Sequence, residues 1–316
     1  MAKATVGGDA VPAPDGLKPR VSAPFETEYC DGTDCFYDYT MRPYPPRGPT
    51  AGKPRSSNLL YQLLSQSRQQ EKWLEIIGAI RRALGVDRTV WGVKLADGKL
   101  MVELYFYLRA LSSSPRHREA SERIARPITV EQVLAALEGR LRVTPTCPAH
   151  APRIMISLDV DDEVLSRGTV DLLHVYMNSG ISYDVRIDAV EHVNHYTFFE
   201  MSETDRLRAL VEHLSNGLIH GSACGVEIQK VLIPELYACR TICLAAKRGA
   251  DAIYFAGIDT DRLLWFLENH GWPRPTLAFV ENNREAFRHL SWDVGLDFIA
   301  RDGEIEWRKT GVYGTF

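Results

Sequence analysis

The sequence predicts an α+β protein built on a large antiparallel β-sheet of about ten strands, closed as a barrel, with helices packed on its outside. Strand-like segments follow one another through short turns, and the Asp-Gly pairs at 97–98 and 302–303 are typical of hairpins. Apolar and polar residues alternate within the strands, so one face suits covering helices. A sheet of this size usually closes, because twist accumulates and open edges invite association.

The expected elements follow one another in a helix, strand-pair, helix order. Helices, each preceded or opened by a residue that can cap its start, are expected at about 58–84, 129–141, 202–219 and 260–270. Strands rich in β-branched and aromatic residues are expected at 89–95, 100–108, 153–160, 170–177, 181–190, 193–200, 240–248, 251–258, 276–281, 289–299 and 304–313.

Residues 1–57 form a segment of different composition, rich in proline, glycine and serine. Prolines lack an N–H donor, so the stretch 41–55 cannot build a helix or a central strand, and we expect an extended N-terminal arm. Its many aromatic residues are unusual for a disordered tail. We therefore expect the arm to dock on the domain or to engage a protein partner, while residues 58–316 form a single domain.

Composition excludes several classes of protein. The 316 residues carry a formal net charge of −4, which gives no overall attraction to nucleic acid or to an acidic membrane. There is no apolar run long enough for a signal peptide or a membrane span, so a cytoplasmic location is expected. The six cysteines are scattered, which favours neither a disulfide framework nor a zinc site.

The two faces of the strands differ in chemistry. In the strand 100–108, Val102 and Phe106 share one face, and Glu103 and Tyr107 share the other. The polar face has two interpretations: it meets water, or it lines the lumen of a closed sheet. Tyrosines beside lysines and aspartates favour the lumen, because such a pocket suits an apolar ligand with a charged end.

Three segments carry a resemblance to a known family. They are the strand pair around Arg248–Phe255 with its following helix and Gly271-Trp-Pro273, the last strand with Arg308–Tyr313, and the hairpin at 97–103. In order and pattern this chain resembles the soluble aromatic prenyltransferases of the antiparallel αββα barrel, over about residues 58–316. Three features depart from that pattern: His174 stands where the family would place a basic residue, the last expected strand is not followed by the family's closing helix before Phe316, and the arm has no counterpart.

The resemblance implies a transferase of prenyl type that uses no metal ion and no cofactor. It would move an allylic group from a diphosphate donor to a small aromatic or indole-like acceptor inside the barrel. Such chemistry needs cations around the departing diphosphate, and aromatic faces with exclusion of water around the carbocation. The implied diphosphate ligands are Lys94, Arg248 and Lys309. Lys247 is the substitute for Arg248, because the alternation at this strand end does not decide which of the two faces inward.

The remaining implied residues complete the site. The shielding aromatic residues are Tyr107, Tyr176, Tyr254 and Tyr313, and Glu103 is the base or the carboxylate that orients the acceptor. Two alternatives stay open: a non-catalytic ligand-binding or scaffold protein that uses the same sheet, and a cyclase or lyase of another class. The string Asp159-Val-Asp-Asp162 matches that of protonating terpene cyclases, but its strand-like surroundings favour a surface turn.

Overall fold

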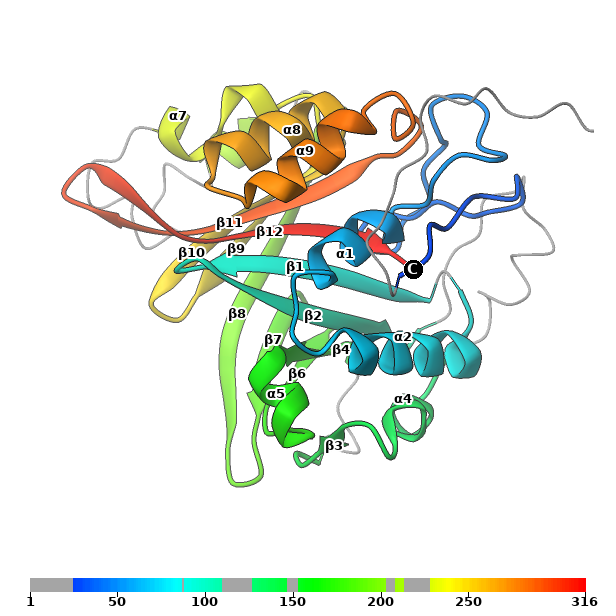
Figure 1. Cartoon of the computed structure of the whole chain (residues 1–316). Coiled ribbons are helices and arrows are strands. Elements are labelled where there is room, and N and C mark those ends of the chain that lie inside the picture. Colours follow the sequence, from blue (N-terminus) through cyan, green and yellow to red (C-terminus); the bar gives the residue numbers. More distant parts are fainter. Residues whose placement is uncertain (1–24, 87, 110–126, 147–152, 203–207, 213–227) are drawn as a thin grey trace, which may run out of the picture.

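Ten strands close into an antiparallel barrel, as the sequence predicts (Figure 1). The computed structural model describes residues 25–86, 88–109, 127–146, 153–202, 208–212 and 228–316. Around the barrel the strands lie in the order β1 (Thr89–Ala96), β12 (Glu304–Thr315), β11 (Trp292–Arg301), β10 (Ala250–Ile258), β9 (Thr241–Lys247), β8 (Val190–Glu200), β7 (Ile181–Val185), β6 (Leu173–Met177), β4 (Arg153–Val160) and β2 (Lys99–Tyr107). A separate parallel pair consists of β3 (Arg142–Val143) and β5 (Thr169–Val170).

The pairing of β1 with β12 closes the ring. The register runs from Val90 opposite Thr315 to Leu95 opposite Thr310, so the first and last strands of the domain lie side by side. Both Asp-Gly turns are tight hairpin turns with two residues in the left-handed region: φ is 49° and 73° at Asp97 and Gly98, and 52° and 78° at Asp302 and Gly303. Glycine and aspartate tolerate this conformation, which explains the hairpins at these positions.

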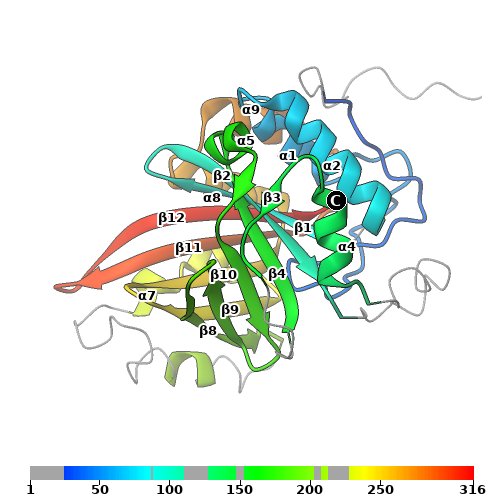
Figure 2. The same ribbon diagram turned by 90° about the horizontal axis from the view of Figure 1, so that it is seen from below.

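Helices cover the outside of the barrel (Figure 2). They are α1 (Ser57–Leu64), α2 (Gln70–Leu84), α4 (Val130–Leu137), α5 (Asp162–Arg167), α7 (Ile228–Val231), α8 (Thr260–Asn269) and α9 (Arg274–Asn282), with a 3₁₀ turn at Pro234–Leu236. Thr129 and Gln132 form the capping box that opens α4, and Asp259 caps α8. In Figure 1, α8 and α9 lie over β11, whereas α2 and α4 lie against each other near β2.

Two expected elements are wrong. The stretch 276–281 lies in α9 rather than in a strand, because its buried residues Thr276, Phe279 and Val280 follow the helical spacing i, i+3, i+4. The expected single helix over 58–84 is two helices, and the break after Leu64 is held by Asp162, which accepts hydrogen bonds from Ser67 and Arg68. The helix expected over 202–219 lies mostly outside the described residues. Within that range, the described residues 208–212 are helical.

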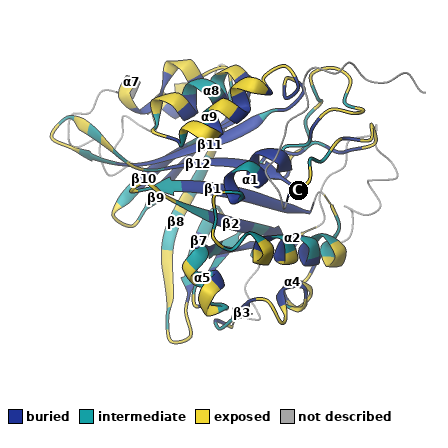
Figure 3. Ribbon diagram, in the orientation of Figure 1, coloured by how far each residue is buried: buried dark blue, intermediate teal, exposed yellow. Residues whose placement is uncertain are grey.

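The hydrophobic core lies between the outer face of the barrel and the helices (Figure 3). Trp91, Leu104, Phe255 and Trp292 point outward from their strands and are fully buried under the helices. Burying such large side chains is the main favourable term in folding. Among the described residues no helix has the length and apolar character required to cross a bilayer.

The described part of the arm packs on the barrel. Phe25, Tyr37 and Met41 are buried, and the Glu28 carboxylate accepts hydrogen bonds from the side chains of Ser57 and Tyr61. A bidentate ion pair between Glu28 and a helix arginine, Arg81, adds to this anchor. The described part of the arm therefore docks on the domain, which is one of the two expectations for it.

Candidate functional site

The lumen of the barrel contains a cavity of about 430 Å³. Its wall is made of inward-facing side chains from all ten barrel strands, together with Tyr39, Thr40 and Arg42 of the arm. Because side chains alternate along a strand, the neighbours of the outward apolar residues point inward, and many of them line this space. A cavity of this size accommodates a small organic molecule.

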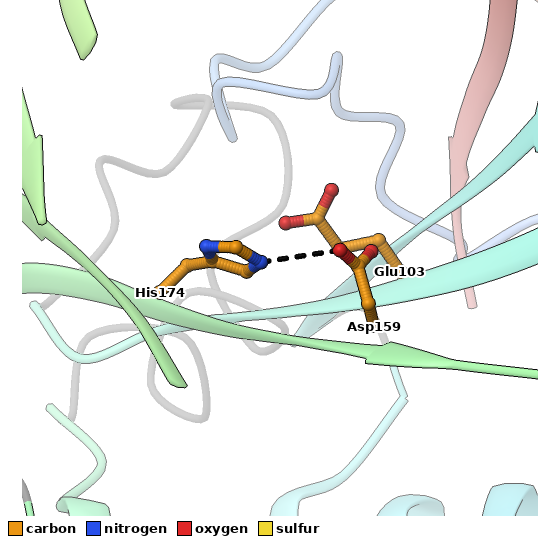
Figure 4. A group of neighbouring side chains, drawn as sticks. All are labelled: Glu103, Asp159 and His174. Atoms are coloured by element: carbon orange, nitrogen blue, oxygen red, sulfur yellow. Dashed lines mark hydrogen bonds and ion pairs between the residues drawn. The ribbon is translucent and has the colours of Figure 1, made fainter. Parts of the chain in front are cut away.

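One group of charged side chains lines the cavity on strands β1, β2, β4, β6 and β7. We call Lys94, Glu103, Asp159, His174 and Asp184 the acidic cluster. Lys94 forms ion pairs with Glu103 and, at 3.0 Å, with Asp159. His174 bridges two carboxylates. Its Nδ1 lies 2.6 Å from Asp184, and its Nε2 lies 3.1 Å from Asp159, the contact drawn in Figure 4. The acidic cluster thus holds three carboxylates and two cationic groups.

A second group lies on β9, β11 and β12. We call Lys247, Asp297 and Lys309 the basic cluster. Lys247 Nζ lies 2.8 Å from both oxygens of Asp297, and Lys309 Nζ lies 2.9 Å from Oδ2 of the same carboxylate. Two ammonium groups therefore share one carboxylate, so this side of the lumen has an excess of positive charge.

The ionisation of these groups follows from their partners. Burial alone would favour neutral carboxyls, but Lys94 more than offsets it and holds the pKa of both Glu103 and Asp159 below the ordinary range. Burial also opposes the imidazolium of His174, yet the hydrogen bonds that it donates to Asp159 and Asp184 raise its pKa to about 9. His174 is therefore charged at neutral pH and donates from both ring nitrogens.

The basic cluster responds differently. Burial lowers the pKa of Lys247, and the neighbouring Lys309 adds to this effect while Asp297 opposes it. Burial would raise the pKa of Asp297, but the two lysines hold it below the ordinary value. An additional anion near Lys247 and Lys309 would relieve their mutual repulsion.

Three ligand atoms of the acidic cluster lie close enough to bind a metal ion. The candidate atoms of Glu103, Asp159 and His174 all lie within 4.8 Å of one another (Figure 4). The Lys94 ammonium, however, already bonds to both carboxylates. A metal ion would have to displace this lysine and compete with the proton on His174, so the donor set fits an ammonium partner better than a divalent ion.

Tyrosine rings form a layer next to the charged groups. Tyr105 follows Glu103, and Tyr176 follows His174, two residues along the same faces of their strands. The tyrosine layer consists of Tyr39, Tyr105, Tyr176, Tyr196, Tyr254 and Tyr313. Neighbouring rings in it have centroids 5.8 to 6.4 Å apart, for example Tyr254 and Tyr313 at 6.0 Å. Burial raises the pKa of these phenols, so they stay neutral.

Glycines on the lumen face make room for these rings. A Cβ atom built on Gly92 would lie 2.6 Å from Cε1 of Tyr313, its cross-strand partner. A Cβ atom on Gly295 would lie 2.5 Å from Cδ1 of Tyr254, again the cross-strand partner. The rings therefore lie flat against strand backbone, an approach that only glycine permits.

Glu103 is the most highly connected group in the lumen. Its carboxylate accepts hydrogen bonds from the hydroxyl groups of Tyr105 and Ser157 and, at 3.2 Å, from that of Tyr176, in addition to its ion pair with Lys94. These donors fix the carboxylate in one orientation facing the cavity.

The cavity brings together all but one of the residues singled out from the sequence. Those that line it are Lys94, Glu103, Tyr107, Tyr176, Lys247, Tyr254, Lys309 and Tyr313. Arg248 does not: its side chain is 72% exposed and pairs with Glu191 outside the lumen. The strand face places Lys247 inward, so the substitute position rather than Arg248 is the one available to a ligand.

Other lining residues were not singled out from the sequence. The alternation of side chains along their strands indicates Tyr105 and Asp297, since they share the inward faces of Glu103 and the other lumen residues. The same alternation indicates Tyr196 less clearly. Asp159, expected in a surface turn, lines the lumen, and Asp161, two residues further on, caps α5. Tyr39 carried no local signal, because its position depends on how the arm docks.

Comparisons with known proteins add little to this geometry. No protein-family model matches the chain, and no curated protein matches it significantly. Among solved structures, a chain described as 6-dimethylallyl tryptophan synthase is similar at a TM-score of 0.23, with 12% identity over 82% of this chain and 71% of that chain. Similarity at this level carries no argument about activity.

Proposed function

We propose that this protein transfers an allylic group from a diphosphate donor to a small aromatic acceptor inside its lumen. The observation that supports this most is the juxtaposition of the basic cluster with the tyrosine layer in one enclosed cavity. Lys247 contacts both, since its ammonium lies beside Asp297 and 5.6 Å from the ring centroid of Tyr254. An allylic diphosphate has the matching shape: a highly charged head joined to an apolar chain.

The basic cluster would receive the diphosphate. When the C–O bond of the donor breaks, its electron pair goes to the diphosphate oxygen, and nearby cations stabilise that charge. Lys247 and Lys309 have one carboxylate between them, so an entering anion gains the attraction of the second ammonium. It must still compete with Asp297, which is a cost of this arrangement.

The tyrosine layer would shield the allylic cation. Aromatic faces attract a cation through their negative quadrupole, and an enclosed site keeps water from capturing it. Tyr254 lies beside Lys247 of the basic cluster, and Tyr313 follows Lys309 four residues along β12, so both rings lie where the cation would form. Their neutral phenols stabilise positive charge without forming a permanent ion pair.

Glu103 would accept the proton of the acceptor. The acceptor carbon forms a bond with the allylic cation, and the resulting ring cation then loses the proton from that carbon to restore aromaticity. Such a ring cation is strongly acidic, so a carboxylate with a lowered pKa is a sufficient base. Glu103 faces the same cavity as the lysines and is held by the hydroxyl groups of Tyr105 and Tyr176.

A ligand-binding experiment tests the proposal. We expect dimethylallyl and geranyl diphosphates to raise the melting temperature more than inorganic diphosphate does, because they fill both layers. The Lys309→Met variant should lose this shift, whereas Arg248→Met, which alters a cation outside the lumen, should keep it. If none of the three compounds raises the melting temperature, the proposal is wrong.

A second candidate is non-catalytic binding of a small molecule. It is favoured by the complete pairing of the lumen charges: each lysine of the two clusters already has a carboxylate partner. Turnover separates the two candidates. Release of inorganic diphosphate in the presence of indoles and phenols supports transfer, whereas binding without release or product formation across that panel supports the binding protein.

A further inference from the structure

The turn formed by residues 37–43 of the arm lies across the end of the barrel where β12 ends. An antiparallel bridge joins its two ends. The Asp38 side chain fixes the turn from within, because Oδ1 accepts hydrogen bonds from the backbone N–H groups of Thr40 and Arg42, both at 2.9 Å. This turn keeps its shape through its own contacts, as a short Asx-type turn does.

Strong polar contacts attach the turn to the barrel. Asp293 of β11 accepts a hydrogen bond from the backbone N–H of Tyr39 at 2.6 Å, and the hydroxyl group of Tyr107 on β2 donates to the Tyr39 carbonyl at 2.6 Å. Arg240, just before β9, forms an ion pair with Asp38. Contacts with three parts of the barrel hold the Tyr39 backbone in one position.

The Tyr39 ring faces the lumen. It lines the cavity and stacks on Tyr254 with centroids 5.8 Å apart and planes 20° apart. Its centroid also lies 5.8 Å from that of Tyr313. The ring therefore extends the tyrosine layer across the barrel end, on the side away from the charged clusters.

We infer that Tyr39 is a specificity-determining residue, which forms an end wall of the lumen and sets the longest ligand that the lumen accepts. A ligand whose polar head lies at the charged clusters points its apolar end toward Tyr39. Because the backbone of Tyr39 is held at both its N–H and its carbonyl, the backbone cannot carry the ring away from the lumen without breaking these bonds. This inference applies to any elongated apolar ligand and does not depend on diphosphate chemistry.

Binding of unbranched para-alkylphenols, from methyl to dodecyl, to the full-length protein tests the end wall by calorimetry. Each added methylene group should strengthen binding about fourfold until the chain reaches Tyr39, after which affinity should fall. In Tyr39→Ala the limit should move to chains longer by roughly three methylene groups, the space that the ring vacates. In Tyr39→Trp the limit should move to shorter chains.

Two controls match these variants. Tyr39→Phe keeps the ring and should keep the wild-type limit, and Tyr29→Ala removes a tyrosine of the same arm that is 42% exposed and should do the same. An identical chain-length limit in wild type, Tyr39→Ala and Tyr39→Trp overturns the inference, as does absence of binding by every alkylphenol. If Tyr39→Ala does not fold, Tyr39→Trp decides. Since these probes carry no phosphate, failure of allylic transfer leaves this result unaffected.

Discussion

The acidic cluster and the basic cluster face each other across one lumen but differ in charge balance. The acidic cluster has three carboxylates for Lys94 and His174, whereas the basic cluster has two lysines for Asp297. Lys94 is surrounded by negative charge, and the pKa of its ammonium lies well above the ordinary value, because Asp159 and Glu103 more than offset the effect of burial. Lys247 has the opposite shift.

This difference predicts which lysines stabilise the fold and which bind a ligand. Removing Lys94 leaves the buried carboxylates of Glu103 and Asp159 without their ammonium partner, although Asp159 keeps its contact with His174. Removing Lys309 leaves Asp297 paired with Lys247. The same residue type, on the same face of the same barrel, is therefore expected to serve stability on one side and anion binding on the other.

The largest effect is expected for Lys94→Met. Loss of one partner of a buried ion pair costs about 3–5 kcal/mol, and here the buried Glu103 carboxylate would lose its ion pair. Lys309→Met should cost much less, since Asp297 keeps Lys247. Urea denaturation of both variants measures the two free energies of unfolding, and equal losses would contradict the distinction between the clusters.

The next effect concerns the pH dependence of stability through His174. Its pKa is about 9 in the folded protein and 6.5 as the ordinary value, so its stabilising contribution is complete below about pH 6.5 and is lost as pH rises through 9. The contribution is on the order of 3 kcal/mol. We expect the free-energy gap between wild type and His174→Gln to narrow over this window, and a gap independent of pH would show that His174 is uncharged.

A smaller effect is expected for Asp297→Asn, which removes the carboxylate that competes with an entering anion. Affinity for inorganic diphosphate should rise about tenfold, equivalent to ~1.4 kcal/mol. Asp159→Asn, a matched change in the acidic cluster, should leave that affinity within about twofold of wild type. Isothermal calorimetry measures the diphosphate affinity of both variants. A larger gain from Asp159→Asn would mean that the anion binds at the acidic cluster rather than at the basic cluster.

The smallest effect is expected for Arg248→Ala. Its ion pair with Glu191 is largely exposed, and such pairs contribute about 0–1 kcal/mol because water and salt screen them. Melting temperature and ligand affinity should therefore match wild type. A clear loss of diphosphate affinity in this variant would mean that the ligand lies outside the lumen.

Much of the site could be predicted from the sequence because strand faces are local. Once the strand around 100–108 is recognised, the period of two places Glu103, Tyr105 and Tyr107 on one side. The error at 276–281 has the same local origin: Leu277 and Phe279 alternate like a strand, although the buried residues Thr276 and Val280 follow a helical period. Lys247 and Arg248 show the limit, since a shift of one residue decides which of them faces the lumen.

Most of the elements, their antiparallel order and the separation of an apolar face from a polar one follow from the sequence, because propensity, turn residues and alternation act over a few residues. The tertiary structure decided what those faces meet. Closure of β1 on β12 turned a polar face into a lumen, and the pairing of β9, β10, β11 and β12 brought the ammonium groups of Lys247 and Lys309 to the Asp297 carboxylate. Docking of the arm placed Tyr39 over Tyr254, more than two hundred positions away in the chain. Contacts at such separations depend on strand order, register and docking, which no local pattern records.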